Sequence, residues 1–152
     1  MWMQIRLLSV AFLTLSIGVL GLPALGHAGG EATVQVDVVS GQQGGSGMDG
    51  AAKKHARILS RVGGYGGWKL AQSFGLKVSL GKTATQGVGK RSFSATLHAL
   101  SESKARATFV VVDTAGKDHK VTAQFSNGAS SVIIAESPRG NGVQVFIIRI
   151  SY

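Results

Sequence analysis

Residues 120–135, KVTAQFSNGASSVIIA, contain the pattern that decides the fold: two short strand-like segments separated by a glycine turn. The segments Lys120–Ser126 and Ser130–Ala135 are typical of β-strands, because branched and aromatic side chains pack well on a pleated surface. Between them, Asn127-Gly128 predicts a type I′ hairpin turn, which needs positive φ at both central residues. We therefore expect antiparallel strands joined by tight turns in this region.

The same pattern extends in both directions along the chain. Further strands are predicted at Thr33–Val38, Gly67–Phe74, Leu76–Leu80, Arg91–Leu100, Arg106–Asp113 and Val143–Ile150. Residues 84–90, broken by two glycines, are expected to be a loop. The separators are too short for crossover helices, so the strands should be antiparallel. The sequence predicts a mainly β protein, an antiparallel β-sandwich of about eight strands with one early amphipathic helix.

That helix is predicted over residues 49–62. Asp49 is a suitable N-cap, and Gly63-Gly64 should end the helix. At about 100° per residue, the apolar residues share one arc with His55, which is expected to be a satisfied boundary residue. The opposite arc is purely basic and consists of Lys53, Lys54, Arg57 and Arg61.

The N-terminal residues have the pattern of a targeting segment. One cation, Arg6, precedes the apolar run Leu7–Leu22 and Pro23. Gly26 and Ala28 are the small residues at positions −3 and −1 of a cleavage site after Ala28. We interpret residues 1–28 as a secretory signal peptide and residues 29–152 as a single β-sandwich domain, periplasmic or extracellular. An uncleaved anchor is the alternative, since residues 7–25 approach the roughly 20 residues that span a bilayer. We expect no transmembrane helix after cleavage.

Composition excludes several classes of protein. The absence of cysteine excludes disulfide frameworks, thiolate zinc sites and a lipidated cysteine. With 44% hydrophobic and 15% charged residues, the chain does not have a disordered composition. Its 16 Lys and Arg against 7 Asp and Glu give a net charge of +9, of which the signal peptide carries only Arg6. The exported domain should therefore be basic and held together by packing.

No catalytic, metal or cofactor site is predicted. Gly81-Lys82-Thr83 lacks the spacing and the following helix of a phosphate-binding loop. Asp113, Asp118 and His119 could form a metal site in a loop, but Asp113 and Asp118 are expected instead to stabilise the turn over residues 114–117. Asp37 lies on the polar face of the first strand, without a second carboxylate to complete an acid/base pair. An enzyme is therefore unsupported by the sequence.

The basic arc is the main functional signal. Like charges four residues apart repel each other, and no acidic residues offset that repulsion here. We therefore predict that Lys53, Lys54, Arg57 and Arg61 contact an anionic glycan, a lipid head group or an acidic protein. The alternative is a face that is merely solvated. Nucleic acid is disfavoured, because the helix lacks interleaved aromatic residues for base stacking.

Two aromatic residues form a second candidate site. Tyr65 and Trp68 lie in the glycine-rich segment 64–68. Exposed rings would offer a ligand platform, whereas buried rings would pack the helix onto the sheet; we favour the second interpretation.

A series of motifs follows the predicted helix: Tyr65-x-x-Trp68-Lys69-Leu70, Leu80-Gly81, Ile133–Gly142 and Val143–Ile148. In this order they resemble an uncharacterised family of small secreted β-domain proteins of Gram-negative bacteria. The resemblance spans most of residues 33–150 and implies an exported β-domain, but no activity and no site residues. Where that family often has a Pro-Gly turn, this chain has Gln86-Gly87-Val88-Gly89.

The C-terminal strand leaves two interpretations open. Phe146, Ile148, Ile150 and Tyr152 alternate and end on an aromatic, as in the last strand of an outer-membrane barrel. Residues 145 and 147 are also apolar, as in the core of a sandwich. We expect an exported, non-enzymatic binding or assembly module. The alternative is a structural or outer-membrane-associated component, at the extreme a small β-barrel, and an enzyme comes third.

Overall fold

The computed structural model describes residues 30–137 and 140–152. The chain divides into two units, Met1–Gly30 and Glu31–Tyr152, and all the described strands and helices lie in the second unit. The predicted signal peptide lies outside the described residues. Within the described ranges, no helix is long and apolar enough to cross a membrane.

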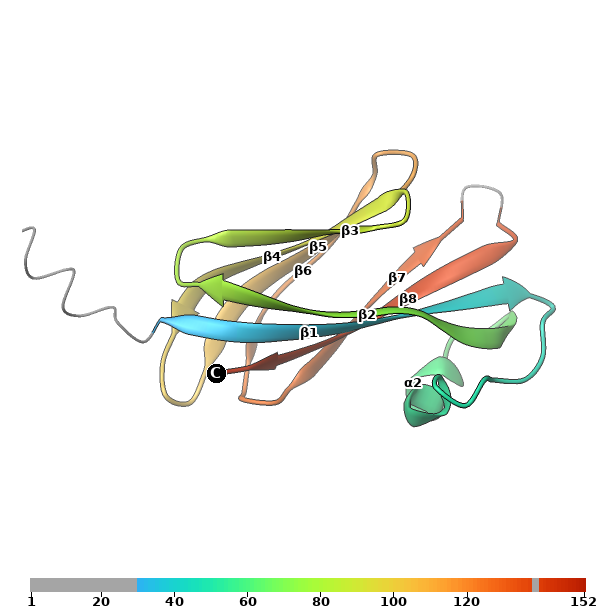
Figure 1. The fold of residues 1–152 in the computed structure, drawn as a ribbon, viewed down its shortest axis with the longest axis horizontal. Coiled ribbons are helices and arrows are strands. Elements are labelled where there is room, and N and C mark those ends of the chain that lie inside the picture. Colours follow the sequence, from blue (N-terminus) through green and yellow to red (C-terminus); the bar gives the residue numbers. More distant parts are fainter. Residues whose placement is uncertain (1–29, 138–139) are drawn as a thin grey trace, which may run out of the picture. The chain divides into compact units, whose positions relative to one another are not determined.

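Eight strands form two antiparallel sheets of four strands each (Figure 1). They are β1 (Glu31–Gln43), β2 (Tyr65–Ser79), β3 (Thr83–Val88), β4 (Arg91–Leu100), β5 (Ala105–Val112), β6 (Asp118–Phe125), β7 (Ser130–Glu136) and β8 (Gly142–Ser151). The first sheet has the order β2-β1-β8-β7 and the second sheet the order β3-β4-β5-β6. The predicted antiparallel β-sandwich is therefore confirmed.

Three strands differ from the prediction, the first of them β1, which has 13 residues and extends beyond the expected Thr33–Val38 at both ends. β2 is one continuous strand of 15 residues where two strands were expected, because β1 pairs along its whole length. Gly75 sits opposite Gln35 in that ladder and does not interrupt it. β3 forms where residues 84–90 were expected to be a loop, since Thr83 to Val88 pair with β4. Gly89 supplies the positive φ of the turn that follows.

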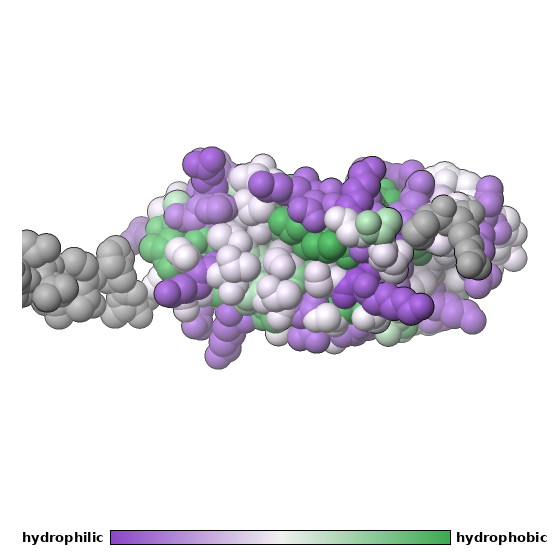
Figure 2. Space-filling view, turned by 90° about the horizontal axis from the view of Figure 1, so that it is seen from above, coloured by the Kyte–Doolittle hydropathy of each residue, from purple (hydrophilic) through white to green (hydrophobic). Residues whose placement is uncertain are grey.

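The main core lies between the two sheets and is rich in phenylalanine. Phe93 of β4 and Phe146 of β8 stack across the sandwich with ring centroids 6.3 Å apart and planes 9° apart. Phe109 stacks on Phe93 from within the second sheet at 6.1 Å. All three rings are fully buried, and burial of such large apolar side chains is the main force that holds the sheets together. On the outside, hydrophilic residues surround hydrophobic patches on the face that Figure 2 shows.

A second core covers the outer face of the first sheet. Its cover is the segment with η1 (Lys53–His55) and α2 (Ala56–Leu59), which Figure 1 draws near one end of β1 and β2. Its buried members are Val39, Ala52, Leu59, Trp68, Val143, Val145 and Ile147. This cover explains why β8 is apolar on both faces, since its alternate residues belong to different cores.

The predicted helix over residues 49–62 is wrong in length. Only a 3₁₀ turn and four α-helical residues form. Lys54 and His55 both reach one carboxylate on β1, and adjacent side chains of a regular α-helix do not face the same way. His55 accordingly leaves the helical region, with φ −106° and ψ 10°. Asp49 still caps the turn that precedes η1, because its Oδ1 accepts a hydrogen bond from the Ala52 N–H at 2.7 Å.

The hairpin predicted at Asn127-Gly128 is also wrong. β6 and β7 belong to different sheets, so the turn carries the chain across the sandwich. Only Gly128 has a positive φ, at 78°, whereas a type I′ turn needs two such residues. The side chain of Asn127 donates to the Tyr152 carbonyl at 3.0 Å and accepts from the Tyr152 N–H at 3.1 Å. The Asn-Gly pair therefore anchors residue 152 beside the crossover.

Candidate functional site

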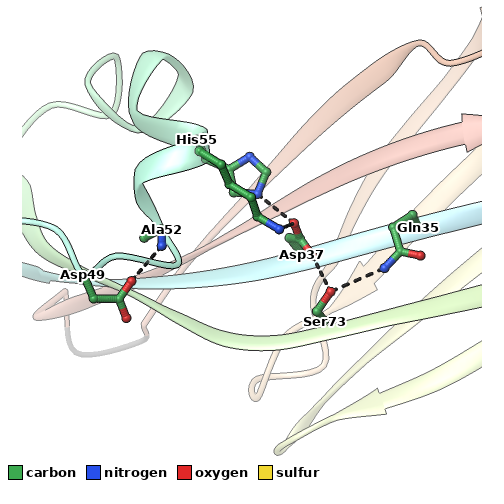
Figure 3. Close-up of polar contacts among 7 residues, drawn as sticks. Gln35, Asp37, Asp49, Ala52, His55 and Ser73 are labelled. Carbon is green, nitrogen blue, oxygen red and sulfur yellow. Dashed lines mark hydrogen bonds and ion pairs between the residues drawn. The ribbon is translucent and has the colours of Figure 1, made fainter.

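The structure brings four polar side chains together on the outer face of the first sheet (Figure 3). Asp37 of β1 is only 7% exposed. Its Oδ2 lies 2.7 Å from both Lys54 Nζ and His55 Nε2. Its Oδ1 accepts a hydrogen bond from the Ser73 hydroxyl at 2.5 Å, in register on β2. We call these residues the Asp37 cluster.

The Asp37 cluster sets the charge of its central carboxyl. Burial by itself would raise the pKa of Asp37. Hydrogen bonds from Lys54, Ser73 and His55 outweigh that effect and lower the pKa from 3.8 to about 2. Asp37 is therefore ionised at neutral pH and cannot serve there as a general acid.

The order of contacts in the Asp37 cluster also argues against a nucleophilic role. In a catalytic triad the imidazole lies between the hydroxyl and the carboxylate and takes the hydroxyl proton. Here Ser73 and His55 each contact Asp37 instead. This arrangement holds the η1–α2 segment on the sheet. The expectation that His55 is a satisfied boundary residue is met by its contact with Asp37.

The four predicted basic residues do not act as one group. Lys54 is paired with Asp37 and thus is not a free cation. The neighbouring His55 contacts the same carboxylate. Lys53, Arg57 and Arg61 are exposed. Within the described part of the chain, no ion pair involves these three. We call Lys53, Arg57 and Arg61 the basic face.

The two aromatic candidates lie within the second core. Trp68 is 4% exposed, so its ring is not an open platform. It packs with Leu59 and Ala52 beneath the η1–α2 segment. Tyr65 is half-buried against the same cluster, and its pKa is raised by burial and by Glu136. These rings join the segment to the sheet.

A groove beside the basic face is a feature that the sequence analysis missed. It has a volume of about 410 Å³ and lies between the η1–α2 side and the outer face of β7. We call it the arginine groove; its lining residues are Arg57, Ile58, Arg61, Val62, Val132 and Ile134. The available signal was the unbroken apolar run 132–134, which makes β7 apolar on both faces.

A second cleft, of about 400 Å³, lies beside Arg91 at the start of β4. The guanidinium of Arg91 already makes two hydrogen bonds within the protein. Nη1 donates to Gln144 Oε1 at 2.5 Å, and Nη2 donates to the Glu136 carbonyl at 3.2 Å. Burial lowers the pKa of Arg91, an effect that Asp113 opposes. Arg91 thus links the two sheets and offers less free charge than the basic face.

Asp113 and His119 stabilise the turn between β5 and β6. Asp113 Oδ1 accepts from the N–H groups of Ala115 and Lys117, both at 2.9 Å. Its Oδ2 lies 3.1 Å from His119 Nε2, and the hydrogen bond from His119 is the main reason that the pKa of Asp113 is lowered. In the described ranges, no three His, Asp or Glu residues are placed to hold a metal ion.

No family model, no curated protein and no solved structure matches the chain.

Proposed function

We propose that this protein is an exported, non-enzymatic binding module that contacts an anionic partner through Lys53, Arg57 and Arg61. The observation that carries the proposal is the exposure of these three cations without an acidic partner in the described chain. Exposed cations that no carboxylate neutralises create a positive potential, which attracts anions and speeds their association. The signal-like pattern of residues 1–28 supports export to the periplasm or beyond.

The scaffold beneath the basic face supports this proposal. Leu59 and Ala52 are fully buried on the sheet, and the Asp37 cluster fixes the turn before α2. The three cations therefore project from a docked segment rather than from a free loop. Preorganised charges lose less conformational entropy when a ligand binds.

Retention on an anionic polysaccharide matrix tests the proposal. The triple variant Lys53→Glu/Arg57→Glu/Arg61→Glu should elute at much lower salt than the unchanged protein, because salt screens exposed charges. The matched control is Lys77→Glu/Lys82→Glu/Lys90→Glu, which changes three exposed lysines elsewhere and lowers the net charge equally. If the two triple variants elute at the same salt concentration, there is no localised site, and the net charge alone explains retention.

Export is tested separately by expression in a Gram-negative host. We expect a soluble periplasmic or secreted product whose first residue is Gly29, as read by mass spectrometry. A product that keeps Met1 in the cytoplasm contradicts export. Extraction only by detergent favours the alternative of an outer-membrane-associated component.

A further inference from the structure

The apolar outer face of the first sheet extends one strand beyond its cover. Val39, Val145 and Ile134 are aligned across β1, β8 and β7. The first two are 0% exposed, whereas Ile134 is 43% exposed. Ile134 is the one large hydrophobic residue that is exposed within the described ranges. The η1–α2 segment therefore leaves an apolar strip on β7 in which Val132 is partly covered and Ile134 is exposed.

Free positive charge borders this strip. Arg57 and Arg61 line the same groove as Val132 and Ile134, and neither makes an ion pair within the described chain. Its volume of about 410 Å³ is within the ~300–1,000 Å³ of small-molecule sites. The groove thus combines an apolar floor with two cations at its side.

We propose that the arginine groove binds an anionic amphiphile, namely an unbranched acyl chain with a carboxylate or phosphate head. The chain packs against Val132, Ile134 and Ile58, and the head group contacts Arg57 and Arg61. Guanidinium groups suit such heads because they donate two parallel hydrogen bonds to carboxylate or phosphate. This inference rests on the proposed function and names the class of anion.

Two other occupants fit the groove less well. A second copy docked through β7 about a two-fold axis would bring the arginines of both copies together, and like charges repel. An extended peptide would pair with the backbone edge of β7. The groove instead lies over the side chains of its outer face, between β7 and residues 57–62.

Calorimetry with three probes tests the proposal: decanoate, decanol and acetate, each below its aggregation concentration. Decanoate should bind at least tenfold more tightly than decanol, which lacks the charge, and acetate, which lacks the chain. Lengthening the carboxylate by one methylene should strengthen binding by up to about fourfold. Decyl phosphate in place of decanoate shows which head group is preferred. Decanoate binding no better than either control overturns the proposal.

Variants locate the binding. Arg57→Gln/Arg61→Gln and Ile134→Ser should each weaken decanoate binding at least tenfold, while Lys77→Gln/Lys82→Gln leaves it unchanged. Ile134 is half-exposed, so its substitution should not unfold the protein. Val132→Thr provides a second change, which makes the lining of the groove more polar by adding a hydroxyl. Unchanged decanoate affinity in both groove variants overturns the site.

The two proposals fail in distinguishable ways. Ile134→Ser should bind decanoate weakly yet keep full retention on the anionic matrix, since its cations are intact. If retention depends on the cations but decanoate does not bind, the amphiphile proposal is overturned and the proposed binding module stands. A dimer that Ile134→Ser dissociates, or capture of an acidic peptide but not decanoate, overturns the amphiphile in favour of that occupant.

Discussion

The carboxylate of Asp37 and the imidazole of His55 lie 2.7 Å apart and join β1 to the turn that precedes α2. Lys54, the preceding residue, reaches the same Oδ2 atom at the same distance. One carboxylate of the sheet thus fixes two successive residues of the segment that carries the basic face.

Replacement of Asp37 by Asn should destabilise the fold by about 2 kcal/mol at pH 7, the amount that corresponds to a pKa lowered from 3.8 to about 2. Because the pKa is lower in the folded state, the ionised carboxylate stabilises above pH 3.8. That contribution is lost as the pH falls from 3.8 through 2. Urea unfolding of both proteins between pH 7 and pH 2.5 measures the difference, which should shrink with acid.

The control for Asp37 is Glu31→Gln, an exposed carboxylate on the same strand. It should change stability by less than about 0.5 kcal/mol at any pH in this range. A difference for Asp37→Asn that stays constant from pH 7 to pH 2.5 would falsify the ionic role of the cluster.

Gly41→Ala should destabilise the protein by about 1–3 kcal/mol, because its methyl group would overlap the Trp68 ring. An added Cβ would lie 2.5–2.9 Å from three atoms of that ring. Thermal unfolding measures the effect. In a Trp68→Leu background the same substitution should cost less, since the ring that it meets is gone.

Gly87→Ala is the matched control for Gly41, since nothing lies within 4 Å of an added Cβ there. It should be neutral or slightly stabilising, because alanine reduces the entropy of the unfolded chain. Equal losses at the two glycines would contradict the close contact with Trp68.

Arg91→Met should destabilise the sandwich by about 1–2 kcal/mol, because it removes the donors to Gln144 and to the Glu136 carbonyl while keeping the apolar stem. Arg106→Met makes the same change at an exposed position of β5 and should cost less than about 0.5 kcal/mol. Denaturant unfolding separates the two. Similar losses for both would show that Arg91 does not link the sheets.

Local sequence patterns predicted the sandwich, because period-two alternation reports directly which residues are buried. Apolar residues at 145 and 147 as well as at 146 and 148 are consistent with one of the two interpretations of β8, a strand buried on both faces. The first and last residues of individual strands were harder to predict from the sequence. Thr83, Thr85 and Val88 of β3 are β-branched, but Gly87 and the following Gly89 interrupt the pattern. The pairing of β3 with β4 therefore could not be recognised from the segment alone.

The candidate site was only partly predictable, because its charges depend on tertiary contacts. Periodicity placed Lys54 with Lys53, Arg57 and Arg61 on one arc. It could not show that Asp37, on a strand distant in sequence, would draw Lys54 and His55 to the sheet. The arginine groove likewise depends on the three-dimensional arrangement, because its lining residues come from the η1–α2 side and from β7.

The pairing of β1 with β8 has a consequence for how the chain acquires its structure. Thr33 lies opposite Ser151, so a central ladder of the first sheet joins segments from the two ends of the domain. During synthesis β1 can pair with β2 early, but its other edge stays open until β8 has emerged. Such distant pairing slows folding, because the entropy of closing the loop is lost before contacts form. Until β8 is available, the first sheet therefore lacks one of its central strands, and the free edge of β1 can pair with another extended segment.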